Sequence, residues 1–182
     1  PVKDAEVLKQ DGYKAVLLAV GLQNSMKLNV PGEDAKGVIQ ALSFLKDVNM
    51  GKKVAVGKNI LVVGGGSVAM DVAMAAKRLG ASNVMVTCLE CSYEEMPAQR
   101  EETAQAEDEG IKIDMSWGPK EILTKAGKVS GVELKRCTTC YVNGKFAPKY
   151  NESETKKVEA DMVITAIGQT AELSFLPADS KV

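Results

Sequence analysis

The chain contains no histidine among its 182 residues. Histidine is the commonest metal ligand and the commonest general base in proteins. Its absence therefore excludes Ser-His-Asp hydrolysis and histidine-ligated zinc chemistry. Hydride transfer stays open, because there a bound cofactor carries the reaction and protein groups mainly orient it.

An excess of charge of one sign and long apolar runs are also missing. Lys and Arg number 23 against 24 Asp and Glu, so the net charge of −1 gives no electrostatic footprint for nucleic acid or an anionic membrane. No apolar run approaches the roughly 20 residues of a membrane span, and no secretory signal opens the sequence. Four cysteines without a secretory context favour a reducing compartment, so we expect a cytoplasmic protein.

The most informative segment is a run of three glycines between an apolar stretch and a helix-forming one. Ile60–Val63 predicts a buried strand, and Val68–Leu79 predicts the helix that follows. The pattern Gly64-x-Gly66-x-x-Ala69 therefore lies on a strand-to-helix turn, where a dinucleotide fingerprint must lie. Gly64 permits the tight turn, Gly66 lets a pyrophosphate approach the backbone, and Ala69 lets the helix pack closely on the strand. The N-terminus of that helix then faces the phosphates.

A second strand and an acid complete the βαβ unit that this motif requires. Val84–Glu90 is apolar and follows the helix after the turn Gly80–Asn83. Its last residue, Glu90, follows the glycines at close to the spacing of about 20 residues expected for a carboxylate that binds a ribose diol. The sequence thus predicts a dinucleotide site. The alternative is a structural glycine turn with a surface glutamate.

The remaining elements predict an α/β fold with a mostly parallel, Rossmann-like sheet and an appended β-meander. The pair Asn143-Gly144 is typical of a tight hairpin in that meander. Further strands are expected at residues 13–21, 111–117, 121–124, 129–142 and 161–168, and further helices at residues 2–10, 37–48 and 97–109. The charged residues 149–160 are expected to be exposed.

The four cysteines form two C-x-x-C pairs, Cys88 with Cys91 and Cys137 with Cys140. Zinc ribbons separate such pairs by roughly 15–20 residues, far fewer than lie between these two. Strand positions three apart point to opposite faces, so the members of a pair should not converge on one ion. We therefore expect ordinary thiols and no metal site.

Five segments together resemble one family across nearly the whole chain. They are Ala15–Gly21, Pro31–Asp34, Gly64–Asp71, Glu94–Ala98 and Asp161–Gly168. In this order they resemble the flavoproteins with two dinucleotide-binding domains, in the branch of the glutamate synthase small (beta) subunit and dihydropyrimidine dehydrogenase. The resemblance implies an NAD(P)-binding domain inserted into an FAD domain, with the first and last segments at the crossovers.

The resemblance also implies a division of the chain and a set of missing parts. Residues 1–50 correspond to a connector from the FAD domain, residues 51–170 to the NAD(P)-binding domain, and residues 171–182 to the start of the return. The family's FAD fingerprint and iron–sulfur segment would lie upstream of Pro1, so FAD is expected in the intact protein and not on this fragment. The implied partners are the missing FAD domain and an iron–sulfur or amidotransferase-type subunit. Thioredoxin reductases carry a redox C-x-x-C in this type of domain, but before the glycine fingerprint, whereas both pairs here follow it.

One departure from the family pattern predicts the cofactor. NADPH-using members typically carry two arginines just after the second strand, before a Ser-x-Glu-Glu-Met-Pro-Ala segment; here Glu90 and Cys91 precede Ser92. A 2′-phosphate needs a cationic partner, whereas a carboxylate accepts hydrogen bonds from a free 2′-hydroxyl. We predict NADH in preference to NADPH. Arg100 or Lys112 would have to fold back to replace the missing arginines.

Each part of the dinucleotide has predicted partners on this chain. The pyrophosphate is assigned to Gly64, Gly65, Gly66, Ser67 and Val68, with Ala69 on the same turn; the adenosine ribose to Glu90, with Cys91 and Ser92 beside it; and the nicotinamide side to Ala166, Ile167 and Gly168. Asp71 either positions the nucleotide or a domain partner, or interacts with the helix dipole. No catalytic acid, base or metal ligand is predicted.

The predicted function is to bind NADH and present it for hydride transfer to a flavin in an oxidoreductase. Two alternatives stay open. One is a non-catalytic nucleotide-sensing or interaction domain, which a fused transporter or regulator domain would favour over a flavin fingerprint. The other is a methyltransferase with the same glycine turn and acid, which would bind adenosylmethionine and no dinucleotide. The terminal electron acceptor is not predicted.

Overall fold

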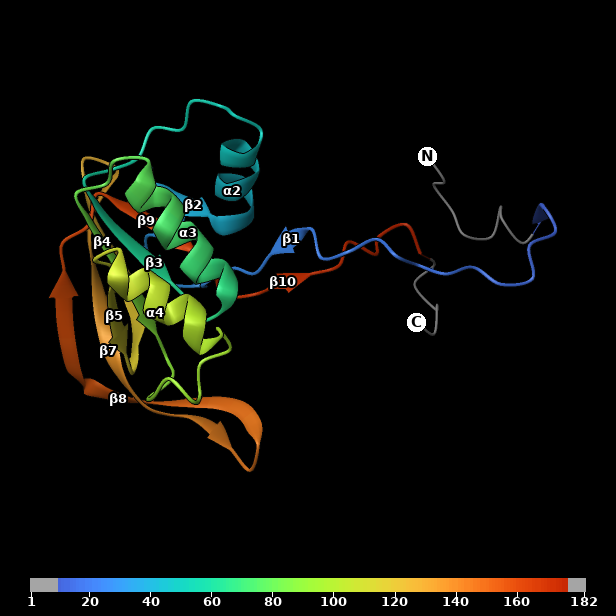
Figure 1. Ribbon diagram of the computed structural model, residues 1–182. Helices are drawn as coiled ribbons and strands as arrows, with labels where there is room; N and C mark the ends of the chain where they lie inside the picture. The colour runs from blue at the N-terminus through green and yellow to red at the C-terminus, as the bar shows by residue number, and fades with distance from the viewer. Residues whose placement is uncertain (1–9, 177–182) are drawn as a thin grey trace. The chain divides into compact units, whose positions relative to one another are not determined.

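Five parallel strands form the central sheet of the computed structural model, which describes residues 10–176 (Figure 1). The expected helix at residues 2–10 therefore lies almost wholly outside the described residues. The strand order is β2-β9-β3-β4-β5, and each neighbouring pair is parallel. The strands are β2 (Val38–Gln40), β9 (Met162–Thr165), β3 (Asn59–Val63), β4 (Asn83–Cys88) and β5 (Lys112–Met115).

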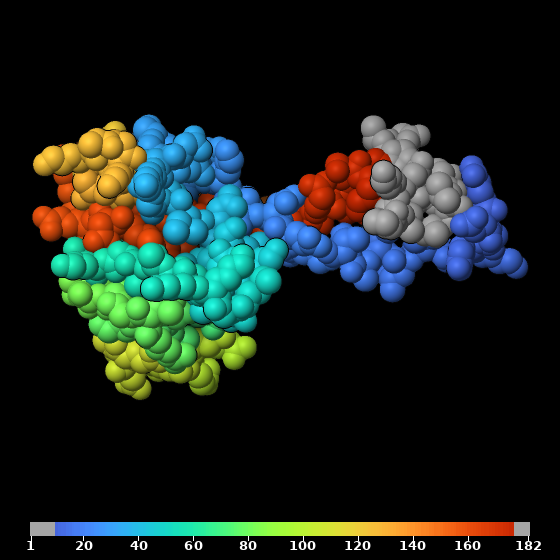
Figure 2. Space-filling model, turned by 90° about the horizontal axis from the view of Figure 1, so that it is seen from above, coloured from blue at the N-terminus to red at the C-terminus, as the bar shows by residue number. Residues whose placement is uncertain are grey.

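Three helices cover one face of this sheet. They lie side by side, and in the space-filling view they follow one another from teal through green to yellow-green (Figure 2). Ile60 and Val62 of β3 point to this face and pack with Met70, Val72 and other buried residues of the central helix, because strand side chains alternate between faces. The helices are α2 (Ala41–Asn49), α3 (Ser67–Arg78) and α4 (Arg100–Asp108).

A three-stranded antiparallel sheet covers the other face. Its strands are β6 (Trp117–Lys125), β7 (Lys128–Val142) and β8 (Lys145–Val158), in that order. Leu61 and Val63, the alternate residues of β3, pack there against Val132 and Leu134 of β7. The predicted parallel sheet with an appended meander is confirmed, and the meander supplies a third layer on the core.

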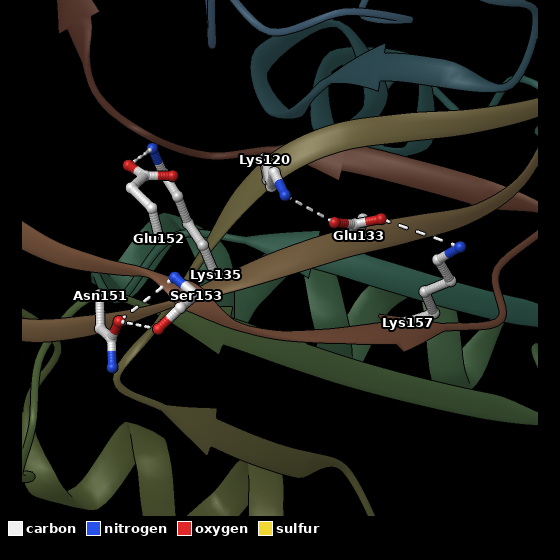
Figure 3. A network of polar contacts seen from close by, with 7 residues as sticks. All are labelled: Lys120, Glu133, Lys135, Asn151, Glu152, Ser153 and Lys157. Carbon is white, nitrogen blue, oxygen red and sulfur yellow. Dashed lines mark hydrogen bonds and ion pairs between the residues drawn. The ribbon is translucent and has the colours of Figure 1, made fainter.

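The meander also carries a charged network. Lys120 Nζ lies 2.9 Å from Glu133 Oε1, Lys157 Nζ lies 3.9 Å from Glu133 Oε2, and Lys135 Nζ lies 2.8 Å from Glu152 (Figure 3). Most side chains of β8 are exposed, as the charge of residues 149–160 predicted. Such exposed ion pairs add little stability, typically below about 1 kcal/mol each.

One predicted element was wrong, and two helices begin later than predicted. Residues 13–21 form no strand, and Leu17 is 90% exposed, because no strand among the described residues pairs with this segment. The helix expected at residues 37–48 begins only at Ala41, since Val38–Gln40 pairs with β9. The helix expected from Pro97 begins at Arg100, where the Glu102 carboxylate accepts the Gln99 N–H at 3.0 Å.

The chain divides into two units by its internal contacts. Lys27–Gly168 holds all three layers, while residues up to Met26 and from Gln169 form the other unit. Within that second unit, β1 (Asn24–Ser25) pairs antiparallel with β10 (Gln169–Thr170). The domain boundaries at residues 50 and 170 stay a prediction. The assignment of the outer segments to a flavin domain stays a prediction.

The strand order places a switch in direction beside β3. The chain runs outward from β3 to β4 and β5, and then returns through the meander to β9 on the opposite side of β3. In open α/β sheets, ligands bind beyond the carboxyl ends of the strands at such a switch point. This edge of the sheet is therefore where the candidate site is expected.

Candidate functional site

The turn after β3 is held tightly between its two neighbouring strands. The Gly64 N–H donates to the Thr87 carbonyl at 2.9 Å, and the Ala166 N–H donates to the Val63 carbonyl at 2.8 Å. Gly64 has φ +139°, and a β-carbon there would lie 2.2 Å from the Ala166 carbonyl oxygen. No other residue type fits this position, so the first glycine of the fingerprint has a steric cause.

The third glycine has room for a β-carbon. Gly66 is the N-cap of α3, and a β-carbon on it would meet only the Pro97 Cβ, at 4.0 Å. Within the described part of the chain, neither the Ser67 N–H nor the Val68 N–H donates a hydrogen bond. Ala69 is fully buried in the helix-side core. This helix end thus combines free donors, a favourable dipole and room for an anion.

The Ser67 hydroxyl is not free. Its Oγ donates to Glu102 Oε2 at 2.6 Å, and the same carboxylate accepts the Gln99 N–H. Ser67 therefore joins α3 to α4 through its side chain, and only its backbone N–H remains for a phosphate. The sequence pattern did not indicate this, because Glu102 lies in the following helix.

Glu90 lies directly against the glycine turn. Its side chain is 6% exposed, and a β-carbon on Gly65 would lie 2.5 Å from Glu90 Oε2. The Glu90 carbonyl accepts the Ser116 N–H at 2.9 Å, which fixes the end of β4. The structure thus brings together the glycines and the acid from the next strand, as the βαβ spacing predicts.

The segment after Glu90 is acidic. The Cys91 N–H donates to Glu95 Oε2 at 2.9 Å, and Cys91 itself is exposed. A hydrogen bond from half-buried Ser92 contributes most to lowering the pKa of exposed Glu94, so that carboxylate keeps its negative charge to lower pH. The neighbourhood of Glu90 therefore carries further negative charge.

In this structure Arg100 has partners of its own, and Lys112 lies at the opposite end of the sheet. The Arg100 guanidinium lies 3.9 Å from the centre of the Tyr93 ring, and its Nη1 donates to Thr103 Oγ1 at 2.7 Å and to Glu107 at 3.3 Å. Lys112 is the first residue of β5 and pairs with Met85, near the amino ends of the parallel strands. The candidate site lies at their carboxyl ends.

The segment after β9 lies beside the glycine turn. Ala166 and Ile167 are half-buried, whereas Gly168 is exposed and has φ +118°. Asp71 is exposed and follows the first turn of α3. Its side chain makes no hydrogen bond to the described residues, so neither of its proposed roles gains a contact.

Comparison with known proteins fits this arrangement. The chain matches the pyridine nucleotide-disulphide oxidoreductase family over residues 2–182. It is a member of that family. Within the family, the chain is 36% identical to the NADP(+)-dependent formate dehydrogenase subunit beta of Moorella thermoacetica, over 92% of this chain and 24% of that protein. It is also 36% identical to the NADPH-Fe(3+) oxidoreductase subunit beta of Geobacter sulfurreducens, over 94% of this chain and 26% of that protein.

The glutamate synthase branch is represented among these relatives. The glutamate synthase [NADPH] small chain of Azospirillum brasilense is 32% identical, over 86% of this chain and 35% of that protein. The chain spans only about a quarter of the length of the first two relatives. The predicted resemblance to this family is confirmed. The activities named for those longer proteins belong to chains of which this one matches only a part.

Solved structures agree on the fold of this family. Mycobacterium tuberculosis FprA in complex with NADPH superposes with a TM-score of 0.76 at 20% identity, covering 93% of this chain and 53% of that chain. The thioredoxin reductase of T. acidophilum gives a TM-score of 0.65 at 23% identity, covering 86% of this chain and 44% of that chain.

The helices of residues 10–176 include none with the length and hydrophobicity that a membrane span needs.

Proposed function

We propose that this chain binds NADH at the carboxyl edge of its parallel sheet and presents it for hydride transfer to an FAD held by another domain. In this proposal the α3 N-terminus, with Gly64 to Val68, holds the pyrophosphate. Glu90 accepts hydrogen bonds from the adenosine ribose. The residues Ala166 to Gly168 line the nicotinamide side of the switch point.

The contact between Glu90 and Gly65 carries the proposal. Glutamate residues are seldom this buried, and the carboxylate of this one faces the glycine turn. A ribose diol would supply donors to that carboxylate while the pyrophosphate sits on the free N–H groups of α3. Family membership and the free helix N-terminus support the same assignment.

The preference for NADH rests on charge. The relatives named above are called NADP- or NADPH-dependent. In this chain a 2′-phosphate would meet the Glu90 carboxylate, while Arg100 is engaged with Tyr93 and Glu107. Two like charges a few ångström apart cost about 1 kcal/mol in water and more in a partly dry site.

The chain's own residues orient the reaction in this proposal and move no proton. A bound NADH would supply a hydride with its electron pair to an FAD held by another domain. Because no histidine is present and no other acid or base is assigned to the nicotinamide side, the chain contributes binding and orientation. We propose an iron–sulfur or amidotransferase-type subunit as the partner of the intact protein. Relatives named as beta subunits or small chains support such an assembly.

A side-by-side titration tests the proposal. NADH and NADPH are added to the 182-residue chain at low salt, and nicotinamide fluorescence reports binding. We expect NADH to bind about tenfold more tightly, equivalent to about 1.4 kcal/mol. Equal or tighter binding of NADPH contradicts the cofactor preference, and binding of neither contradicts the dinucleotide site.

A further inference from the structure

The thiols of Cys137 and Cys140 lie close together in the meander, although their spacing in a strand predicted that they would diverge. Cys137 Sγ and Cys140 Sγ are 3.7 Å apart, and both residues, in β7, are only 1% exposed. The expectation that C-x-x-C positions in a strand diverge was wrong for this pair. Among residues 10–176, no group of three or more potential ligands surrounds a metal position, so these sulfurs form a two-thiol site.

Irregular strand pairing brings the sulfurs together. The register between β7 and β8 shifts between Cys137 and Thr139, and again between Thr139 and Tyr141. Each shift interrupts the alternation of side chains, so residues three apart can point to one side. Cys137 Sγ also lies 3.3 Å from the Thr139 carbonyl oxygen, across the bulge.

We propose that Cys137 and Cys140 are a redox dithiol, which a small-molecule disulfide converts to an intramolecular disulfide. Forming the bond shortens the distance between the two sulfurs from 3.7 Å to about 2.05 Å. This inference does not depend on nucleotide binding.

The exchange takes two steps. Burial raises the pKa of both thiols, so each reacts through the small fraction that is deprotonated. The thiolate of one cysteine attacks one sulfur of the disulfide R–S–S–R, forming a mixed disulfide and releasing one R–S⁻. The thiolate of the other cysteine then attacks the sulfur of the first and releases the second R–S⁻. The protein pair is oxidised, R–S–S–R is reduced, and the two thiol protons end on the released thiols.

The short sequence separation of the two cysteines favours a reversible disulfide over one that stabilises the fold. A disulfide between residues this close in sequence closes a very short loop, so it removes little entropy from the unfolded chain. Access needs only local opening, because Thr138 between the cysteines is exposed and the strand pairing around them is irregular.

The pair also adjoins the candidate nucleotide site. The Cys137 N–H donates to the Ser116 carbonyl at 2.8 Å, and the Ser116 N–H donates to the Glu90 carbonyl at 2.9 Å. Trp117, the only tryptophan in the chain, follows Ser116 and pairs with Arg136 in the register of β6 and β7. Disulfide formation should therefore change the fluorescence of Trp117.

The test uses the full chain with Cys91→Ser, which removes the exposed thiol. The protein is incubated with excess hydroxyethyl disulfide at mildly alkaline pH, and thiols are then counted after unfolding. We expect two of the three remaining thiols to be lost without an adduct, and a peptide joining Cys137 to Cys140 in the digest. Trp117 emission should change in parallel and recover with dithiothreitol.

The control variant is Cys91→Ser with Cys140→Ser. It should stop at a mixed disulfide on Cys137, with one added mercaptoethanol group and no cross-link. Retention of all three thiols in the Cys91→Ser chain would overturn the proposal. A bond from Cys88 to either residue, or separate adducts on Cys137 and Cys140, would overturn it too. These readouts use thiol chemistry alone, so they stand whether or not NADH binds.

Discussion

Gly64 lies against the carbonyl oxygen of Ala166 so closely that an added β-carbon would be 2.2 Å from it. This contact joins the turn after β3 to the end of β9, the two strands on either side of the topological switch point. The same backbone approach that forbids a side chain at Gly64 brings the predicted pyrophosphate and nicotinamide segments together.

Substituting this glycine should damage the fold itself. Gly64→Ala combines a strained φ of +139° with the clash at Ala166, so we expect a loss of about 2 kcal/mol or more in the free energy of unfolding. Urea denaturation followed by circular dichroism measures it. A loss below about 0.5 kcal/mol would mean that the turn is not held as described.

Gly66→Ala is the matched control. Gly66 has extended backbone angles (φ −95°, ψ 172°) that alanine adopts freely, and its β-carbon would make only an ordinary contact, at 4.0 Å, with Pro97. We expect the free energy of unfolding to change by less than about 0.5 kcal/mol. NADH affinity should fall about tenfold or more, because the methyl group would occupy the space proposed for the pyrophosphate. Unchanged affinity would remove Gly66 from the site.

Glu90→Gln tests the ribose contact. The amide keeps the size of the side chain but loses the charge that accepts hydrogen bonds from a diol. We expect NADH affinity to fall by about 10- to 100-fold, the range for losing a charge-assisted bond of about 1.5–3 kcal/mol. NADPH affinity should fall less, since repulsion is relieved. An equal loss for both nucleotides in the fluorescence titration would argue against a role in choosing between them.

Ser67→Ala should separate stability from binding. The Ser67 hydroxyl donates to Glu102 at 2.6 Å, so its removal should cost about 1 kcal/mol of unfolding free energy. Because only the backbone N–H of this residue is proposed to meet the phosphate, NADH affinity should stay within about twofold. A large loss of affinity with unchanged stability would show that the hydroxyl binds the nucleotide.

The Arg78–Glu109 pair predicts a pH dependence. Arg78 Nε donates to Glu109 Oε2 at 3.1 Å, and this contact lowers the pKa of Glu109 below its ordinary value of 4.5. A lowered folded-state pKa adds stability that is present above pH 4.5 and is lost as the pH falls through the folded value. Urea midpoints of the wild type and Arg78→Gln should therefore differ at pH 7 and converge as the pH falls below 4.5 and through the folded-state pKa. A constant difference would mean that the pair adds nothing through its charge.

Much of the central unit could be predicted from local sequence. The apolar run at Ile60–Val63 and the amphipathic stretch after Gly66 form β3 and α3 within one or two residues of their expected bounds. The short strand Val38–Gln40 could not be predicted, because three residues carry no periodicity and only pairing with β9 makes them a strand. The strand predicted at residues 13–21 was wrong for the opposite reason. Its sequence pattern is typical of a strand, but no strand among the described residues pairs with it.

Some contacts of the candidate site could likewise be predicted from the sequence, and others could not. Glu90 could be assigned to the glycine turn, because a βαβ unit fixes how far the second strand's end lies from the first. The contacts of Arg100 with Tyr93 and Glu107 could not be predicted from the sequence. A long side chain can reach many groups, and the fold decides which of them lie nearby.

The sequence by itself determined the parallel unit, its glycine turn and the acid beside it, because these depend on side-chain period, on glycine's missing β-carbon and on short chain distances. Only the tertiary structure decided what the meander does. It packs a second sheet on the core and, through register shifts against β8, brings Cys137 and Cys140 to 3.7 Å. Bulges depend on the partner strand, which the residues of β7 alone do not specify.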